Sequence, residues 1–156
     1  MSGGSDGGFT LIELVTVMTV LGILAAFLGP RFFSQQVFSE RGYADELASA
    51  LRVSQKVAVA TDCPVQLTLT STSYAAAQQA AAGNACNPAD TTWSVTVIGA
   101  DGNAVQGSAP SGTTVSPTGV FKFDDQGRLT TSPATTLTIG LRTITIDAGT
   151  GLVQVQ

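Results

Sequence analysis

The sequence predicts an α+β protein in which a long N-terminal helix, first transmembrane and then amphipathic, packs on a C-terminal antiparallel β-sheet or sandwich head. Three observations lead to this prediction. Residues 9–28 form an apolar run that contains one charged residue. Apolar residues then recur at helical spacing as far as residue 60. After Pro64 the pattern changes to the alternation of apolar and polar residues that is typical of strands.

The composition argues against several classes of function. The chain has 156 residues, enough for one domain with a core, and its net charge is −4. Seven Lys and Arg residues, none of them clustered, offer little electrostatic attraction to nucleic acid. The absence of His removes the commonest general base and the commonest metal ligand. With no P-loop or nucleophilic Ser motif either, the sequence predicts no enzyme, no metal and no cofactor.

The apolar run predicts a transmembrane and assembly helix over residues 9–30. A helix of about 20 residues spans the hydrocarbon core of a bilayer. Three threonines in the run, Thr10, Thr16 and Thr19, can bond back to the helix backbone. The run closes at Pro30.

Three other interpretations of the run compete with this one. A buried core helix is disfavoured because so small a domain can hardly enclose a run of this length. A secretory signal peptide has a shorter apolar part and a positively charged head, whereas residues 1–8 contain no Lys or Arg. A plain single-span anchor leaves Glu13 without a role, although an unpaired acid at membrane depth is costly.

A cut between Gly8 and Phe9 would give Glu13 a partner. The new amine of Phe9 would lie one helical turn from the carboxylate of Glu13. These two charges can compensate each other within one chain or between neighbouring helices. In a bundle of staggered copies, each Glu13 can pair with the amine of the next copy, and such pairing favours assembly.

The segment GFTLIE, followed by an apolar helix, resembles the class III signal of type IV pilins and type II secretion pseudopilins. The matching residues are Gly8, Phe9, Thr10, Leu11, Ile12 and Glu13, and Pro30 falls where that family often carries a helix-bending proline. The resemblance implies that a prepilin peptidase cuts after Gly8 and methylates the amine of Phe9, and that Glu13 is the assembly residue. Methylation keeps the positive charge of the amine, so it leaves the pairing intact.

The resemblance also implies a location and partners. It implies an inner-membrane protein with one span and a periplasmic head, which later joins a pilus or pseudopilus filament. Its partners would be the prepilin peptidase, other pilin or pseudopilin subunits and the inner membrane. The leader, residues 1–8, departs from the family because it lacks the Lys or Arg that hold the N-terminus inside. Either the true start lies further upstream or other features set the orientation.

Beyond the span, the sequence predicts an amphipathic helix over residues 31–61 that packs on a β-rich head, residues 62–156. Its apolar positions lie three or four residues apart, and charged residues fill the positions between them. Gly42 weakens the helix by about 1 kcal/mol relative to Ala. We expect the helix to end near Ala60, before Pro64.

The head is predicted to contain short antiparallel strands joined by tight turns. The expected strands cover residues 65–70, 93–98, 120–123, 136–139, 141–146 and 152–155, with turns at residues 101–102, 124–127 and 148–151. Residues 74–82 fit either a strand or a short Ala-rich helix. The Gly-, Ser- and Pro-rich stretch 99–118 is expected to be an exposed loop or a ragged edge.

The C-terminal part carries a second resemblance, to the GspH/FimT family of minor pilins and pseudopilins, including MSHA-type minor pilins. A phenylalanine strand and a glycine turn precede two closing strands joined by a Thr-Gly hairpin. The matching residues are Phe121, Phe123, Gly127, Ile144, Ile146, Thr150, Gly151 and Val153.

Each of two side-chain pairs in the head allows two interpretations. Cys63 and Cys86 are too few for a zinc site and predict a disulfide, worth roughly 3 kcal/mol, in an exported protein; two buried thiols are the alternative. Asp124 and Asp125 are adjacent, so they are expected to be solvated turn residues rather than a catalytic carboxylate pair.

The sequence therefore predicts a structural minor pilin or pseudopilin subunit, with a type IV pilus slightly favoured over a type II secretion pseudopilus. One alternative is a pilus-associated DNA-uptake receptor, which needs a basic patch. The head offers only Lys122, Arg128 and Arg142, which argues against nucleic acid as a partner. Another alternative is a simple membrane-anchored periplasmic domain.

Overall fold

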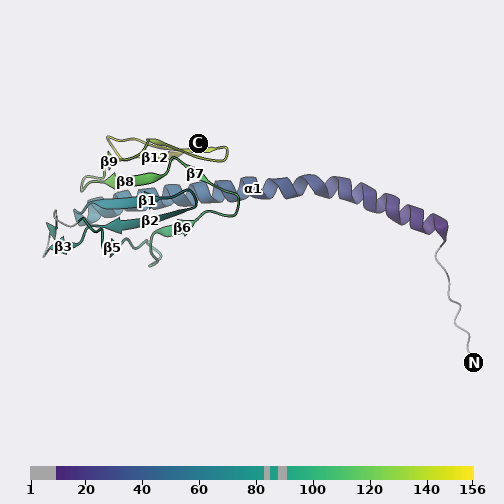
Figure 1. Cartoon of the computed structure of the whole chain (residues 1–156), viewed down its shortest axis with the longest axis horizontal. Coiled ribbons are helices and arrows are strands. Elements are labelled where there is room, and N and C mark those ends of the chain that lie inside the picture. Colours follow the sequence, from purple (N-terminus) through teal and green to yellow (C-terminus); the bar gives the residue numbers. More distant parts are fainter. Residues whose placement is uncertain (1–9, 83–84, 88–90) are drawn as a thin grey trace, which may run out of the picture. The chain divides into compact units, whose positions relative to one another are not determined.

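The computed structural model describes residues 10–82, 85–87 and 91–156, without the side chains of residues 26–35, 81–82 and 85. The chain divides into two units, Met1–Gln35 and Gln36–Gln156. One helix, α1 (Leu11–Thr61), runs through the described part of the first unit and continues into the second, as Figure 1 shows. The twelve strands found among the described residues all belong to the second unit. From here on the head means this whole unit (Gln36–Gln156), which includes the last part of α1. The α+β prediction is therefore confirmed.

No helix within the described residues is both long and apolar enough to cross a membrane. The span predicted over residues 9–30 includes Phe9 and the side chains of residues 26–30, which lie outside the described part of the chain.

The start of α1 is set by Thr10, whose hydroxyl accepts a hydrogen bond from the amide of Glu13 at 3.3 Å. This is the geometry of an N-cap. The helix ends at Thr61, because Asp62 takes a positive φ of 51° and the amide of Cys63 donates to the carbonyl of Ala58 at 3.2 Å. These two features form a Schellman-type C-cap. The observed end is one residue beyond the predicted one.

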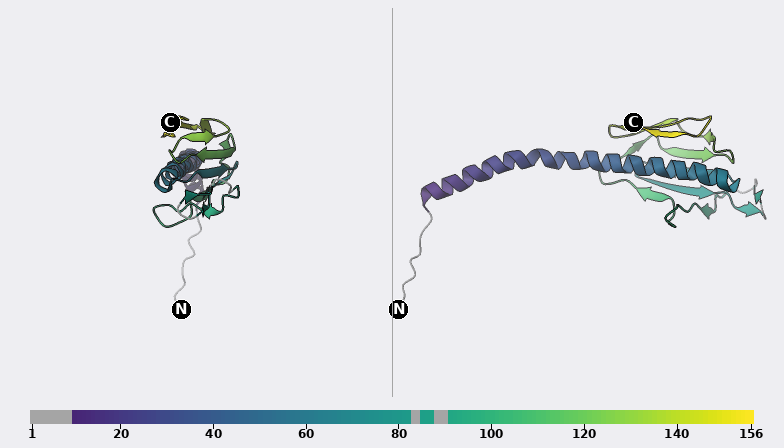
Figure 2. Two further views of the ribbon diagram at one scale, coloured as in Figure 1. Left: turned by 90° about the vertical axis from the view of Figure 1, so that its left-hand side faces the viewer. Right: turned by 180° about the vertical axis from the view of Figure 1, so that it is seen from behind.

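The head part of α1 buries one face against the strands. Its buried residues recur at helical spacing and include Tyr43, Leu47, Leu51 and Ala58. The two views in Figure 2 place the strands of the head alongside these turns of α1. This part of α1 is therefore amphipathic, with one face buried in the head.

The larger sheet has the strand order β5-β2-β1-β8-β9, with β6 also paired to β2. Its strands are β1 (Val65–Leu69), β2 (Ser73–Gln78), β5 (Val95–Thr96), β6 (Gln106–Ser108), β8 (Gly119–Phe123) and β9 (Leu129–Thr131). The central strands are antiparallel, and Leu67 pairs with Ala76 on one side and Phe121 on the other. Alternate residues of β1 and β8 point into the core.

The second sheet has the order β12-β11-β10-β7 and is also antiparallel. Its strands are β7 (Val115–Ser116), β10 (Thr136–Ile139), β11 (Arg142–Ile146) and β12 (Val153–Val155). Leu137, Ile139, Ile144 and Ile146 are buried, and threonines occupy the outward positions between them. Both sheets thus contribute apolar side chains to the same core as α1.

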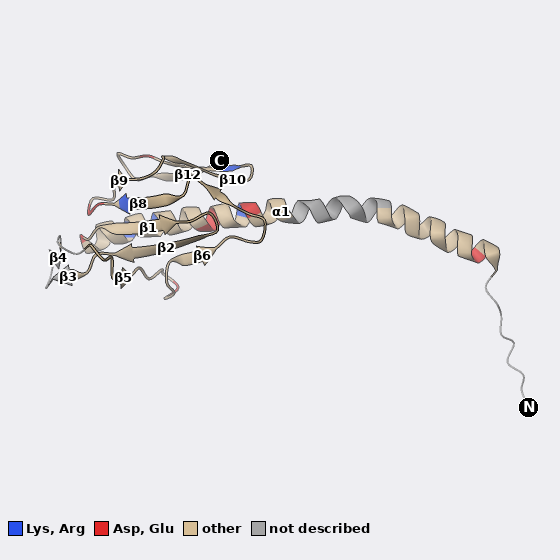
Figure 3. Ribbon diagram, in the orientation of Figure 1, with Lys and Arg blue, Asp and Glu red and all other residues tan. Residues whose placement is uncertain are grey.

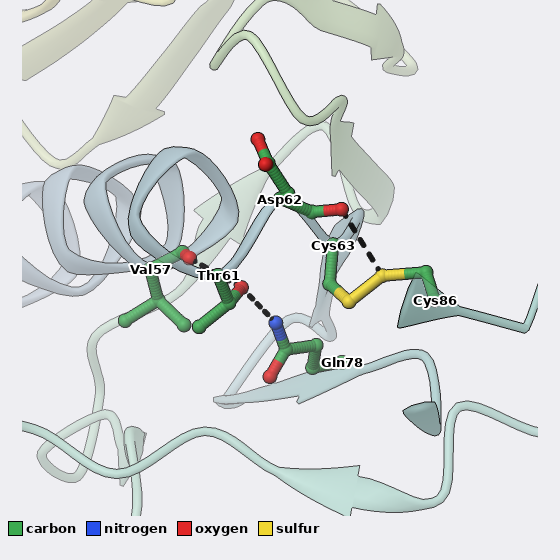
Figure 4. Close-up of a disulfide and its surroundings, with 6 residues drawn as sticks. All are labelled: Val57, Thr61, Asp62, Cys63, Gln78 and Cys86. Atoms are coloured by element: carbon green, nitrogen blue, oxygen red, sulfur yellow. Dashed lines mark hydrogen bonds between the residues drawn. A yellow bond between two sulfur atoms is a disulfide. The ribbon is translucent and has the colours of Figure 1, made fainter. Parts of the chain in front are cut away.

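The structure joins Cys63 and Cys86 in a disulfide, shown in Figure 4. The bridge links the residue after the C-cap of α1 to the small hairpin of β3 (Ala81–Ala82) and β4 (Ala85–Cys86). Nearby, the side-chain amide of Gln78 donates to the hydroxyl of Thr61, which itself donates to the carbonyl of Val57 at 2.7 Å. The end of α1 is therefore tied covalently to the β3–β4 hairpin and by a hydrogen bond to β2 of the larger sheet.

Several sequence expectations for the head need correction. Of the two options for the stretch 99–118, the exposed loop is wrong and the ragged edge fits, because the stretch contains the short edge strands β6 and β7 and buries Val105, Thr113 and Val115. These strands pair at only two or three positions, too few for a periodic signal. The strand expected over residues 93–98 is reduced to β5 and an isolated bridge at Ile98. Of the two options for residues 74–82, the strand is correct, since Tyr74 to Gln78 belong to β2 and a short β3 follows.

Candidate assembly site at the start of α1

The candidate site is the described N-terminal part of α1, residues 10–25. The spacing Thr10-Leu-Ile-Glu13 is that of a capping box, in which Thr is the N-cap and Glu is the third helical residue. An acid at this position also interacts favourably with the positive end of the helix dipole. Local helix physics therefore supplies a second reason for an acid at Glu13, which the sequence interpretation missed although the T-x-x-E spacing signals it.

The polar side chains that follow Glu13 are satisfied within the helix. The hydroxyl of Thr16 donates to the carbonyl of Glu13 at 2.9 Å. The hydroxyl of Thr19 donates to the carbonyls of Val15 at 3.0 Å and Thr16 at 2.8 Å. The predicted back-bonding of these threonines is thus confirmed. It lowers the cost of placing hydroxyl groups in apolar surroundings.

The apolar side chains of this segment are not covered by the chain. Every described residue from 10 to 25 is exposed, including Leu11 at 81% and Met18 at 66%. The exposed large apolar residues lie on all sides of the helix rather than on one stripe: Leu11, Ile12, Leu14, Val15, Val17, Met18, Val20, Leu21, Ile23 and Leu24. Such a surface requires lipid or other protein chains to cover it.

Glu13 is the single charged residue of this segment. Figure 3 shows one acidic position in the first turn of α1, followed by turns without charged residues. Within the described residues its carboxylate has no ion-pair partner. Gly8 and Phe9, the predicted cleavage and methylation residues, lie outside the described residues. Only the sequence relates them to Glu13: Phe9 precedes Glu13 by four positions.

The head contains a second group of interacting polar residues, where α1 meets the larger sheet. The hydroxyl of Tyr74 on β2 donates to the carboxylate of Glu46 on α1 at 2.6 Å. The ring of Tyr43 lies 6.2 Å from that of Tyr74, centroid to centroid. Burial and the Glu46 carboxylate raise the pKa of both tyrosines above the usual value of 10.0. A Cβ added at Gly107 would lie 2.7 Å from the ring of Tyr74, so the cluster also requires a glycine on β6.

Two other acidic residues of the head have local structural roles. The carboxylate of Asp124 accepts hydrogen bonds from the amides of Gln126 and Arg128 and so closes the predicted 124–127 turn. The carboxylate of Asp147 accepts bonds from the amide and hydroxyl of Thr150, which lower its pKa. Across the described residues there is no group of three or more Cys, Asp or Glu side chains placed to hold a metal ion.

The comparisons with known proteins bear on the N-terminal site. A family model described as the prokaryotic N-terminal methylation motif matches residues 4–29. The match spans Gly8, Phe9 and Glu13 and supports a type IV pilin-like protein that a prepilin peptidase processes. Proteins with this motif are structural subunits rather than enzymes and are anchored in a membrane before they assemble into pili. Searches of curated proteins and of solved structures give no match to the chain.

Proposed function

We propose that this chain is a minor pilin or pseudopilin: a structural subunit that is cut after Gly8, methylated on Phe9 and assembled through α1 into a type IV pilus or a type II secretion pseudopilus. Before assembly it would sit in the inner membrane by a single span, with the head in the periplasm. Between the two filament systems we favour the type IV pilus, as a GspH/FimT-type minor pilin of the MSHA kind.

One observation carries this proposal. The methylation motif coincides with a helical segment whose apolar side chains are exposed on every side and whose single charge lies in the first turn. A lipid bilayer can cover the apolar side chains, but it cannot pair the carboxylate. A bundle of helices can do both, because neighbouring helices bury the apolar side chains and a neighbouring N-terminal amine can neutralise Glu13.

A second part of the proposal concerns the head, to which we assign a role in specificity. Its core is closed by α1, two sheets and a disulfide, so it is a stable structure carried at the end of the assembly helix. Its surface bears few charges, since the chain has only seven Lys and Arg and eleven Asp and Glu. We propose that this surface selects the neighbouring subunits or the tip position.

The variant Glu13→Gln tests the assembly role. Gln can fill the third position of a capping box as Glu does, so the start of the helix is kept while the charge is removed. We expect the variant to be processed and inserted in the membrane but to be lost from sheared filaments. Thr16→Val is the matched control, because it changes a polar side chain one turn further along without changing charge. Normal incorporation of Glu13→Gln into filaments would refute the pairing.

Mass spectrometry of the N-terminus tests the processing role. Cells with active prepilin peptidase should yield a chain that begins at Phe9 and carries one methyl group, whereas an uncut chain would indicate a plain membrane-anchored domain.

A DNA-uptake role would need a basic surface, and the head offers little support for one. Of the three basic side chains of the β-rich region, that of Lys122 lies over the ring of Trp93, 5.0 Å from its centroid.

A further inference from the structure

The end of the head at which α1 enters is formed by two loops beside Gln36 and Glu40. A Cβ added at Gly140, in the turn between β10 and β11, would overlap the carboxylate of Glu40. A Cβ added at Gly112 would lie 3.9 Å from the side-chain amide nitrogen of Gln36. Both loops therefore lie beside the first turns of α1 in the head. The chain continues from this point toward the apolar segment of α1.

Leu141 projects from this end of the head. It lies at the tip of the β10–β11 hairpin and is 89% exposed, more than any other large apolar side chain among the described residues. Tight hairpin loops are usually occupied by polar residues and glycine, as at Gly140. Because the head does not use Leu141 in its core, the side chain is available to another apolar environment.

The charges around this tip are mixed, and basic residues flank it. Arg142 follows Leu141 directly, and Arg41 is exposed on the adjoining turn of α1. The nearest acid, Glu40, is half-buried against Gly140 and accepts a hydrogen bond from Gln36 at 3.3 Å. Asp45 is exposed one turn further along α1. An apolar tip flanked by arginines matches the membrane interface, where leucine enters the acyl boundary and guanidinium groups meet phosphates.

We propose that the Leu141 tip contacts the membrane before the subunit is assembled. Leu141 enters the interfacial region of the bilayer, and Arg41 and Arg142 face the phosphates of anionic phospholipids. The inference rests on the proposed function, because it requires the apolar segment of α1 to anchor the chain in the same bilayer. The contact would orient the head on the membrane, and it would have to be released when the subunit enters a filament.

The neighbouring β11–β12 hairpin provides a matched control, because its turn lies beside a different turn of α1. Leu152 is also exposed, at 53%, and it follows Gly151, whose added Cβ would lie close to the side chain of Gln55. Gln55 and Glu40 are fifteen residues apart on α1, which corresponds to about 22 Å along the helix. The proposal therefore predicts lipid contact at Leu141 and none at Leu152.

The test uses the full chain in vesicles of phosphatidylethanolamine and phosphatidylglycerol that carry bromine atoms near the headgroup. Trp93, the single tryptophan, is replaced by Phe, and Leu141→Trp or Leu152→Trp supplies the fluorophore. We expect brominated lipids to cause a clear loss of fluorescence for Leu141→Trp and little loss for Leu152→Trp. The difference should shrink when phosphatidylcholine replaces phosphatidylglycerol, because the arginine contacts need anionic phosphates.

An equal loss of fluorescence at the two positions would overturn the inference. So would a loss at Leu141→Trp that is unchanged when phosphatidylcholine replaces phosphatidylglycerol. The inference would also be overturned if the fluorescence of Leu141→Trp changed with the amount of protein in the vesicles and not with brominated lipid. That result would assign the tip to contact between subunits. Flotation of the chain with the vesicles separates the two proposals. A chain that does not float contradicts the membrane step of the proposed function, whereas a floating chain without selective loss at Leu141 contradicts only the present inference.

Discussion

At the scale of single residues, the acid in the first turn of α1 has two compatible explanations. The cap formed by Thr10 and the helix dipole favour Glu13 in any helix that starts here. Neither effect requires exposed apolar residues to surround the acid, and capping contributes only about 1 kcal/mol. The assembly role explains why a charge is kept in the middle of an apolar surface. The Glu13→Gln variant keeps the cap and removes the charge, so any loss of assembly comes from the charge itself, through the helix dipole or through pairing with a neighbouring amine.

Alkaline pH should unfold the head through its tyrosines. The chain has only two, Tyr43 and Tyr74, and both lie beside Glu46 with a raised pKa. Because the folded state favours the neutral phenols, their contribution to the free energy of unfolding is complete below the unfolded pKa of about 10. That contribution is lost as the pH rises above this value. We expect tyrosinate absorbance to appear together with loss of the folded circular dichroism signal. In the variant Tyr74→Phe, the alkaline unfolding transition should be accompanied by the ionisation of one phenol only. Tyrosinate absorbance that appears while the head is still fully folded would contradict this account.

At the scale of elements, α1 is held to the two sheets by a few long polar side chains. The side-chain amide of Gln55 donates to the carbonyls of Gly127 at 3.2 Å and Thr150 at 2.7 Å, and so joins the two turns that follow β8 and β11. The guanidinium of Arg52 donates twice to the carbonyl of Val153 on β12. Close approach at Gly151 is also required, since an added Cβ would overlap the carbonyl of Gly127.

Replacing Gln55 with Glu should weaken this connection. The substitution has nearly the same shape but places a carboxylate oxygen against two carbonyl oxygens, so two hydrogen bonds are replaced by repulsion. We expect a loss of about 1–3 kcal/mol in the free energy of unfolding, measured by urea denaturation of the full chain in detergent. The adjacent exposed residue gives the control, Lys56→Gln, which should change stability little. An unchanged midpoint for Gln55→Glu would show that the amide is not needed.

The elements that the sequence predicted well are those with a strong repeating pattern. Alternation identified β1, β8, β10 and β11 to within one residue at each end, and Asp62 to Pro64 marked the end of α1. The sequence missed β6 and β7 because two- or three-residue strands form by pairing with a neighbour already in place, as Gly107 does opposite Tyr74. The tyrosine cluster was also missed, since residues 43, 46 and 74 are brought together only by tertiary packing. At the N-terminal site the sequence identified Glu13, and the cap became apparent from the geometry.

At the scale of the whole molecule, the chain separates two tasks between its units. The described residues 10–25 have exposed apolar side chains and only local hydrogen bonds, so their free energy depends on what surrounds them. The head has its own core and its own disulfide, so its stability is set internally. This arrangement suits a subunit that must pass from a bilayer into a filament, since only the surroundings of the helix need to change while the head stays folded.

Mutations in the two units should therefore have independent effects, because sites without shared partners contribute additively. We expect Glu13→Gln to leave the urea midpoint of the head unchanged while it lowers the fraction of subunit found in filaments. Gln55→Glu should lower the midpoint without altering flotation of the full chain with vesicles. The double variant should show both effects at their single-variant size, to within about 0.5 kcal/mol in the free energy of unfolding. A larger deviation would mean that Glu13 and the head share an interaction, and assembly would then be coupled to the fold of the head rather than carried by α1 alone.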